Sequence, residues 1–452
     1  MFIALFFLLL IAACTLGLVR DQGGMSLLAL VGFTQDPIRK VIAGEPVMMT
    51  VMVGLVVGCM ALRRVMNPSS NLLEPFYGWS RNIATPLNIY LCILLMQGAH
   101  SFIRYGSLIL TGLGAVFYLA PLVAIIVGYF QFNNFKLVSH FLFIFCGLSF
   151  VVCLSVLASY YGIKSDFFGE VGSGLIIYDQ GTILKAYSGL MRSSEIASWH
   201  MGVAVCFVII LVFDRATPFR YALAIIIVML FFAAIILTGR RKMLLQIVIF
   251  SSLYFPVLRY YQGRFSARFL SAALIAVVLM SSIYWLFPSF EGTQYDLYLA
   301  RGASVFGDAG ERFTTLGLGS IGWAYNQYGF LGGGLGVAAQ GSQHFVQGIV
   351  GGASEGGIGK LVSELGLISL VVLAWLSIVF AKHLHKCLKM VADLAPEKLL
   401  FSVGVLVFLV SNLPTFIVAS QVYGDVFVLI VLGLLAGSLF GLPRQVSRHF
   451  EE

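Results

Sequence analysis

Charged residues are scarce in this chain. Asp, Glu, Lys and Arg together make up 11% of the 452 residues, whereas hydrophobic residues make up 59%. Soluble domains are typically about 25% charged, so the composition predicts a polytopic membrane protein. The net charge of +8 does not indicate a nucleic-acid partner, because the basic residues are scattered in loops between apolar segments, where membrane topology and anionic lipids explain them.

The signatures of several common chemistries are also missing. No P-loop, HExxH or CxxC motif occurs, so the sequence gives no support for ATP-driven transport or zinc catalysis. The seven cysteines lie in apolar segments or beside a basic loop. Their positions argue against a disulfide framework and against a cysteine metal site. We therefore expect neither a metal nor a cofactor.

Long apolar segments are abundant instead. Twelve of them have about the length that a helix needs to cross a hydrocarbon core roughly 30 Å thick. They lie near residues 2–19, 45–62, 83–99, 107–130, 137–158, 199–213, 221–238, 243–258, 269–287, 361–380, 399–417 and 424–441. The sequence thus predicts an all-α integral membrane protein with about 12 transmembrane helices in one domain, residues 1–452. The first segment lacks a basic n-region, so we expect a retained helix rather than a cleaved signal peptide.

Two connections between these segments are much longer than the others, residues 159–198 and the glycine-rich residues 288–360. Long connections inside compact folds are usually functional. An even number of spans puts both termini on one side of the membrane. With the termini inside, the cytoplasmic segments hold 15 of the 28 Lys and Arg residues, as the positive-inside rule favours. This orientation predicts cytoplasmic termini and two long loops on the outer face.

The tight bend "GRRK" places Arg240, Arg241 and Lys242 between two predicted spans. In the orientation above, these three cations face outward, on the disfavoured side. Cations near bilayer depth typically face a cavity, a partner or a ligand, and adjacent guanidinium groups match the geometry of an oxyanion. The alternative is that the bend faces the cytoplasm and serves only as a topology anchor.

The first long loop ends in "GLMRSSEIASWHMGV", which brings Arg192, Glu195 and His200 to the start of a span. On a helix, Glu195 and Trp199 are neighbours, as are Ile196 and His200. These side chains are candidates for binding a polar headgroup or a sugar. The alternative is an interfacial belt, with Trp199 at headgroup level and the charges solvated beside it.

The second long loop contains Arg312, the glycines of "LGGGLG" and His344. Glycines let backbone amides approach a bulky ligand and form anion-binding nests. His344 is a candidate acid, base or phosphate donor, because imidazole titrates near neutral pH; the alternative is a solvated residue. Three ionisable residues follow where the chain re-enters the membrane: Glu355, Lys360 and Glu364.

In this order, the stretches "MRSSEIASWH", "LTGRRKMLL", "ERFTTLGLGSIGWAYNQYGFLGGGLG" and "QHFVQ…SELGLISL" resemble the O-antigen polymerase and O-antigen ligase superfamily. The resemblance covers roughly residues 185–380. It implies a twelve-helix, GT-C-like glycosyltransferase of the bacterial inner membrane. Such enzymes use an undecaprenyl-pyrophosphate-linked glycan at the periplasmic face, without a metal or a nucleotide sugar.

The resemblance also suggests roles for individual residues. The family's bend arginine corresponds to Arg241, or to Arg240 if the bend is shifted by one residue, and its loop arginine and histidine correspond to Arg312 and His344. The chain departs from the family where Phe345 follows the histidine in place of the frequent asparagine, and where the bend has a basic pair. Glu195, Glu355 and His344 are the candidate bases. The expected substrate-binding residues are Arg240, Lys242, Arg192, His200 and Glu355.

These observations predict a polymerase that joins lipid-linked oligosaccharide repeats. A ligase that transfers the glycan to lipid A-core or another acceptor is the nearest alternative. A polysaccharide or lipid transporter is less favoured, because most predicted spans have no ionisable residue at mid-depth. A noncatalytic scaffold is the last alternative. The expected partners are the lipid-linked donor, a glycan acceptor, membrane lipid and a chain-length regulator, with no nucleic acid.

Overall fold

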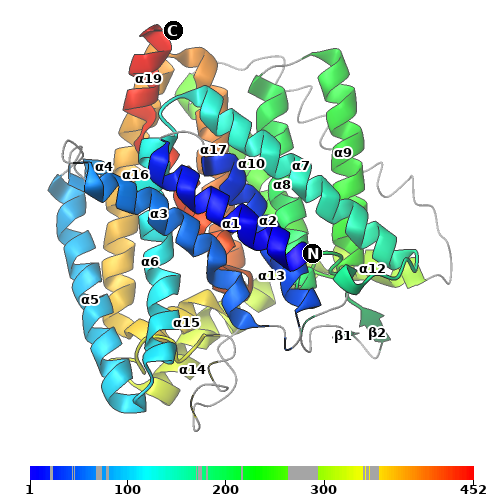
Figure 1. Ribbon diagram of the computed structural model, residues 1–452, viewed down its shortest axis with the longest axis horizontal. Helices are drawn as coiled ribbons and strands as arrows, with labels where there is room; N and C mark the ends of the chain where they lie inside the picture. Colours follow the sequence, from blue (N-terminus) through cyan, green and yellow to red (C-terminus); the bar gives the residue numbers. More distant parts are fainter. Residues whose placement is uncertain are drawn as a thin grey trace.

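The computed structural model describes residues 1–20, 24–42, 44, 46–67, 74–77, 81–168, 171, 176–179, 182–214, 217–262, 294–339, 342, 346 and 356–451. Long helices form a bundle, and the short helices between residues 294 and 365 lie with a β-hairpin at one end of it (Figure 1). The part of the chain described here is therefore almost entirely helical, as the composition predicts.

The helices of the first half are α1 (Phe2–Val19), α2 (Gly24–Val41), α3 (Met52–Met66), α4 (Glu74–Tyr77), α5 (Arg81–Tyr105), α6 (Leu108–Gln131) and α7 (Phe135–Tyr160). Those of the second half are α8 (Ser194–Asp214), α9 (Pro218–Leu237), α10 (Lys242–Gln262), α12 (Gln294–Ala303), α13 (Val305–Arg312), α14 (Gly319–Tyr328), α15 (Gly357–Leu365), α16 (Leu367–Leu394), α17 (Leu399–Val418), α18 (Val426–Phe440) and α19 (Leu442–Glu451). Strands β1 (Ile176–Asp179) and β2 (Thr182–Lys185) pair antiparallel, with Ile176 opposite Lys185. Short 3₁₀ helices are η1 (Val47–Val51), η2 (Asp166–Phe168), η5 (Pro396–Lys398) and η6 (Val422–Gly424), and η3 (Phe313–Leu318) is a π-helix.

Local capping signals set the starts of several long helices. The side chains of Ser107, Asn134, Thr217 and Asp425 each accept a hydrogen bond from a backbone amide in the first turn, at the starts of α6, α7, α9 and α18. Such caps satisfy amides that have no partner inside the helix. Each of these helices then continues for the length of its apolar segment.

Ten helices of the described residues are long and apolar enough to cross a membrane, and α18 with α19, bent by 57°, makes an eleventh candidate. These helices coincide with eleven of the twelve predicted segments. The twelfth, residues 269–287, lies outside the described residues. The chain is accordingly a multi-pass membrane protein.

Helix α2 was not predicted from the sequence, and it is not among the candidate spans. It packs against both α1 and α3, which also contact each other. The Cβ position at Gly24 lies against Met60, and Lys40 Nζ donates to the Gly189 carbonyl at 2.8 Å. Its 18 residues rise by about 27 Å, close to the thickness of the hydrocarbon core. The sequence analysis missed α2 because Asp36 and its neighbouring cations interrupt the apolar pattern.

A contact of Phe2 shows at which end of the bundle the N-terminal residues lie. The rings of Phe2 and Phe167 lie 5.3 Å apart, so the first residues sit beside the first long loop. We call the end of the bundle with this loop, the Gly239–Lys242 bend and α12 to α15 the loop end. The other end, where α8 stops, α9 starts and α19 lies, is the opposite end (Figure 1).

The glycines after α14 pack tightly against α5 and α6. Gly334 and Gly336 have φ angles of 98° and 88°, and a Cβ at Gly336 would lie 2.2 Å from the Leu110 carbonyl oxygen. Ser101 Oγ donates to the Leu335 carbonyl at 2.7 Å. The interpretation of this cluster as an anion-binding nest is therefore corrected: the glycines allow backbone to meet backbone.

A buried carboxyl group secures the same loop. The Tyr118 hydroxyl donates to Glu364 Oε2 at 2.5 Å, and the Ala338 amide donates to Glu364 Oε1 at 3.2 Å. Burial raises the pKa of Glu364, against the opposing effects of Lys360 and of these hydrogen bonds. Glu364 thus packs inside the fold, although the sequence suggested a position at the membrane mouth.

Candidate functional site

The bend between α9 and α10 is held by local hydrogen bonds. Thr238 Oγ1 donates to the Ile235 carbonyl at 2.6 Å and accepts from the Arg240 amide at 3.3 Å. Gly239 then adopts a φ of 66°, a left-handed conformation that glycine tolerates best. The chain reverses direction at Gly239, and the three cations Arg240, Arg241 and Lys242 follow directly.

Glu195, near the start of α8, is the acidic partner of two of these cations. Its Oε1 lies 3.1 Å from Arg240 NH1 and 3.1 Å from Lys242 Nζ. Arg240 Nε also donates to Ser194 Oγ at 2.9 Å. With its amide group turned, Gln421 donates to Glu195 Oε2 at 2.8 Å. The start of α8 and the α17–α18 connection therefore fix the bend cations in place.

The second long loop supplies another cation and a hydroxyl. Arg301 of α12 donates through Nε to the Gly239 carbonyl at 3.0 Å. Arg241 hydrogen-bonds Ser304 Oγ, and that hydroxyl donates to the Arg301 carbonyl at 2.9 Å. Arg241 is largely buried by these contacts. The second loop thus packs directly on the bend.

The two long loops also contact each other. The Tyr298 hydroxyl of α12 donates to the carbonyl of Lys185, the last residue of the β-hairpin. The rings of Tyr298 and Tyr187 lie 6.4 Å apart. Residues of both long loops therefore contact the bend: Ser194 and Glu195 from the first, and Arg301 and Ser304 from the second.

Arg192 lies close in sequence to Glu195 but belongs to a separate ion network. Its NH1 lies 2.7 Å from Asp425 Oδ2 and 3.4 Å from Asp36 Oδ1, and its amide donates to Asp36 Oδ2 at 3.1 Å. Burial alone would lower the pKa of Arg192, but the two carboxylates outweigh it and raise that pKa above its ordinary value. Asp425 also caps α18, so Arg192 links three helices.

His200 is buried, which does not fit the predicted role in binding a sugar or headgroup at an outer mouth. Only 1% of its surface is exposed. Its Nδ1 contacts the Ile196 carbonyl at 2.8 Å, within its own helix, and its ring stacks on Phe145 and Phe427. The interfacial belt is also wrong, because Trp199 is fully buried and donates to Asn412 Oδ1 at 3.1 Å.

The remaining predicted residues are placed only in part. Arg312 is the last residue of α13, half-buried, at the junction with η3. Since α13 begins directly after Ser304, Arg312 lies about 12 Å farther along the helical path. The length of α13 thus separates Arg312 from Ser304, the hydrogen-bond partner of Arg241. His344 and Glu355 lie outside the described residues.

Sequence reasoning missed several residues that build the site. Arg301, Ser304 and Gln421 hold the bend, and Asp36 and Asp425 hold Arg192. Charged residues in or beside apolar helices were the available signal, since membrane helices retain them only with partners. Ser304 and Gln421 themselves had no such signal, because both are ordinary polar residues.

The bend gathers several cations. Around it, the described side chains bring together four cations and one carboxylate: Arg240, Arg241, Lys242, Arg301 and Glu195. Guanidinium groups are matched to phosphate oxygens and donate two hydrogen bonds in a fixed fork. Among the described residues, no three His, Cys, Asp or Glu side chains are grouped as metal ligands would be.

Together the helices and the bend define a multi-pass membrane protein with a cationic site at its loop end. Comparison of the chain with protein-family models, with curated proteins and with solved structures gives no match. The function is therefore argued from the site.

Proposed function

We propose that this chain is a GT-C-like glycosyltransferase of the bacterial inner membrane. It polymerises undecaprenyl-pyrophosphate-linked oligosaccharide repeats into O-antigen or exopolysaccharide at the periplasmic face. The observation that carries the proposal is the group of four cations at the bend, which residues of both long loops contact. Its partners are the lipid-linked donor, a glycan acceptor and a chain-length regulator.

The chemistry explains why cations are needed there. When the bond between the anomeric carbon and the phosphate oxygen breaks, negative charge increases on the leaving pyrophosphate. Guanidinium groups held in advance at that position stabilise the transition state more than the ground state. Arg241 hydrogen-bonds Ser304 Oγ, which in turn donates to the Arg301 carbonyl, and we assign Arg241 to the leaving group. Arg312 extends the cationic surface toward the glycan.

We assign Glu195 a positioning role rather than that of the catalytic base. Its carboxylate is already occupied by Arg240 and Lys242 at 3.1 Å each. A base must be free to reach the acceptor hydroxyl, and these two ion pairs oppose that. Glu195 keeps the two cations oriented, and the base comes from elsewhere in the loops, where His344 and Glu355 are the remaining candidates.

The loop end is proposed to face the periplasm. The cations of the opposite end include Lys136, Arg220, Lys398, Arg444 and Arg448, and the positive-inside rule places such an end in the cytoplasm. With α2 counted, the N-terminus then lies at the periplasmic end and the C-terminus in the cytoplasm. This proposal replaces the expectation of two cytoplasmic termini.

The length distribution of lipid-linked glycan tests the proposal. A strain that lacks the gene is complemented with the wild type, with Arg241→Ala, or with Arg448→Ala, which removes an exposed cation at the opposite end. We expect single repeats to accumulate without the gene and a ladder to return with the wild type and with Arg448→Ala. Arg241→Ala should lower product by about 10²–10³-fold at normal abundance.

Arg241→Lys should also be defective, because an ammonium group cannot reproduce the two-pronged contact of a guanidinium group. Long chains stranded on the lipid carrier in the deletion strain would instead identify a ligase. An unchanged ladder in that strain would refute both glycosyltransferase functions.

A further inference from the structure

A large cavity lies far from the bend. It is a groove of about 940 Å³ between α7, α8 and α9, at the opposite end of the bundle. Its volume is within the range of about 300–1,000 Å³ typical of small-molecule sites. Nothing in the proposed glycosyl transfer uses this groove, so it requires its own explanation.

The walls of the groove are apolar and open to the lipid-facing side. Phe143, Phe150, Leu223 and Ile227 are among the side chains that line it, and Phe143 is 69% exposed. Along α7 the lining extends from residue 136 to residue 150, a helical rise of about 21 Å. This length exceeds the half-thickness of a hydrocarbon core about 30 Å thick, so the groove is long enough for an acyl chain within one leaflet.

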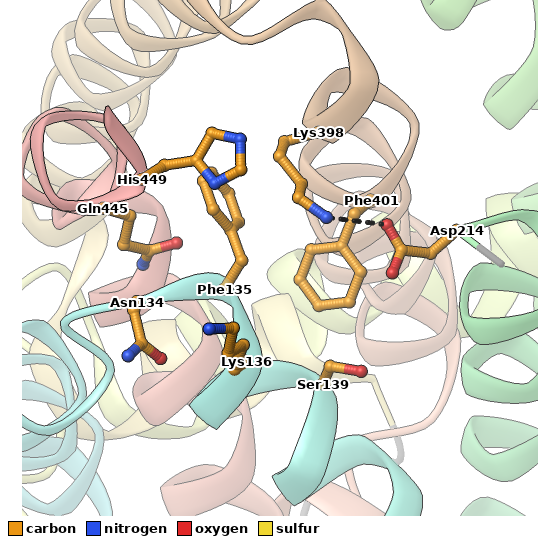
Figure 2. A pocket seen from close by; sticks show the side chains of 9 residues that line it. All are labelled: Asn134, Phe135, Lys136, Ser139, Asp214, Lys398, Phe401, Gln445 and His449. Carbon is orange, nitrogen blue, oxygen red and sulfur yellow. Dashed lines mark ion pairs between the residues drawn. The ribbon is translucent and has the colours of Figure 1, made fainter. Parts of the chain in front are cut away.

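The mouth of the groove is polar and basic. Lys136, His140 and Arg220 line it together with Asp214. A smaller cavity of about 80 Å³ adjoins the mouth and shares Lys136, Ser139 and Asp214 with the groove. Figure 2 shows these side chains around the smaller cavity, with the ion pair of Lys398 and Asp214 at 3.5 Å.

The two cavities together match the shape and charge of a lipid. Among their described lining residues, three cations, Lys136, Arg220 and Lys398, accompany one carboxylate, Asp214. Several waters fit in the smaller cavity, and a phosphate group can take their place there. Basic pockets between transmembrane helices recognise anionic headgroups in this way.

We propose that this groove is a binding site for one anionic glycerophospholipid of the leaflet at the opposite end. The phosphate lies in the smaller cavity near Lys136 and Lys398, and an acyl chain lies along α7 against Phe143 and Phe150. The site is independent of glycosyl transfer at the loop end, so either proposal can fail alone.

Gly147 gives a direct way to fill the groove. It lines the cavity, and a Cβ built on it meets no atom within 4 Å. Gly147→Phe therefore places a ring in the acyl-chain path. Gly112 in α6 is the matched control, because a Cβ there also meets no atom within 4 Å and the residue does not line the groove.

The charges are tested separately. Lys136→Gln with Arg220→Gln removes two cations from the mouth, and Lys382→Gln with Lys386→Gln removes two exposed cations of α16 from the same end. The measurement is native mass spectrometry of the full-length protein in detergent, with phosphatidylglycerol and phosphatidylethanolamine added at equal concentration. Each variant is compared with the wild type for the fraction that retains one lipid.

We expect the wild type to retain one phosphatidylglycerol in preference to phosphatidylethanolamine. Gly147→Phe should abolish this retention, and removing the two mouth cations should weaken it by about fivefold for each cation. Both control variants should match the wild type. Equal retention of the two lipids, or undiminished phosphatidylglycerol binding in Gly147→Phe, would overturn the proposal, as would retention of a polyprenyl phosphate in its place.

Discussion

Two groups of ion pairs surround the start of α8, and they differ in balance and burial. In one, Arg192 lies between Asp36 and Asp425, whose side chains are 3% and 2% exposed. In the other, Glu195 lies between Arg240 and Lys242, whose side chains are 23% and 17% exposed. The first group surrounds a cation with carboxylates, and the second surrounds a carboxylate with cations.

This difference separates a structural network from a site that can bind a ligand. An anion that approached Arg192 would meet two carboxylates and would have to displace one of them in a buried environment. An anion that approached the bend would meet Arg240 and Lys242 beside a single described carboxylate, that of Glu195, with Arg241 and Arg301 nearby. Arg192 and Glu195 are close in sequence, yet they have different roles because the fold gives them different partners.

The largest effect on folding is expected from the buried network. Arg192→Ala leaves Asp36 and Asp425 without their guanidinium partner, and removing one partner of a buried ion pair costs about 3–5 kcal/mol. We expect a lower melting temperature in detergent and reduced membrane abundance. Arg240→Ala, from the more exposed group, is the matched control and should keep normal abundance. A stable Arg192→Ala protein that makes no product would move Arg192 into the ligand site and end the distinction.

The buried network also shows where sequence reasoning succeeded and failed for the fold. Apolar length was enough to locate the long helices, because a membrane span is specified mainly by composition. It was not enough for α2, because the charged residues of α2 give it the composition of a loop. Only the structure shows that Asp36 is paired with Arg192. That contact joins residues 156 positions apart, and no local pattern encodes it.

The site was predictable to a similar degree. The bend drew attention to Arg240, Arg241 and Lys242 because three cations there are unusual between apolar helices. The role of Glu195 as their shared partner depends on how α8 packs against the bend, and the burial of His200 depends on rings from α7 and α18. Spacing along one helix could not distinguish a buried histidine from an exposed one.

A third environment sharpens the comparison, since Glu364 is a buried carboxyl group with no guanidinium among its described hydrogen-bond partners. Burial raises its pKa above the ordinary value of 4.5, so the folded protein holds this proton more tightly than the unfolded chain. Its contribution to stability is therefore complete below the ordinary pKa and is lost as pH rises through the raised value. We expect the melting temperature to fall with rising pH, measured from pH 4.5 to 8.5.

Glu364→Gln, which resembles the protonated form, should remove this part of the pH dependence. Glu364→Ala leaves the Tyr118 hydroxyl and the Ala338 amide without their acceptor, which costs about 1–3 kcal/mol for each buried group. The same pH slope in Glu364→Gln as in the wild type would assign the dependence to another group.

The smallest effect on stability is expected at the bend, in a double-mutant cycle of Arg240→Gln and Glu195→Gln. The Arg240 side chain is 23% exposed, and exposed ion pairs contribute about 0.2–1 kcal/mol. Thermal unfolding in detergent should give a coupling energy in this range, well below that of the matching Arg192→Gln and Asp425→Asn cycle. Activity should fall more than stability in each bend variant. Stabilisation of the transition state depends on the exact orientation of the cations, whereas the folded structure depends on it much less. Equal coupling energies in the two cycles would mean that the bend ion pairs stabilise the fold as much as the buried network does. The cations of the bend would then no longer indicate a bound anion.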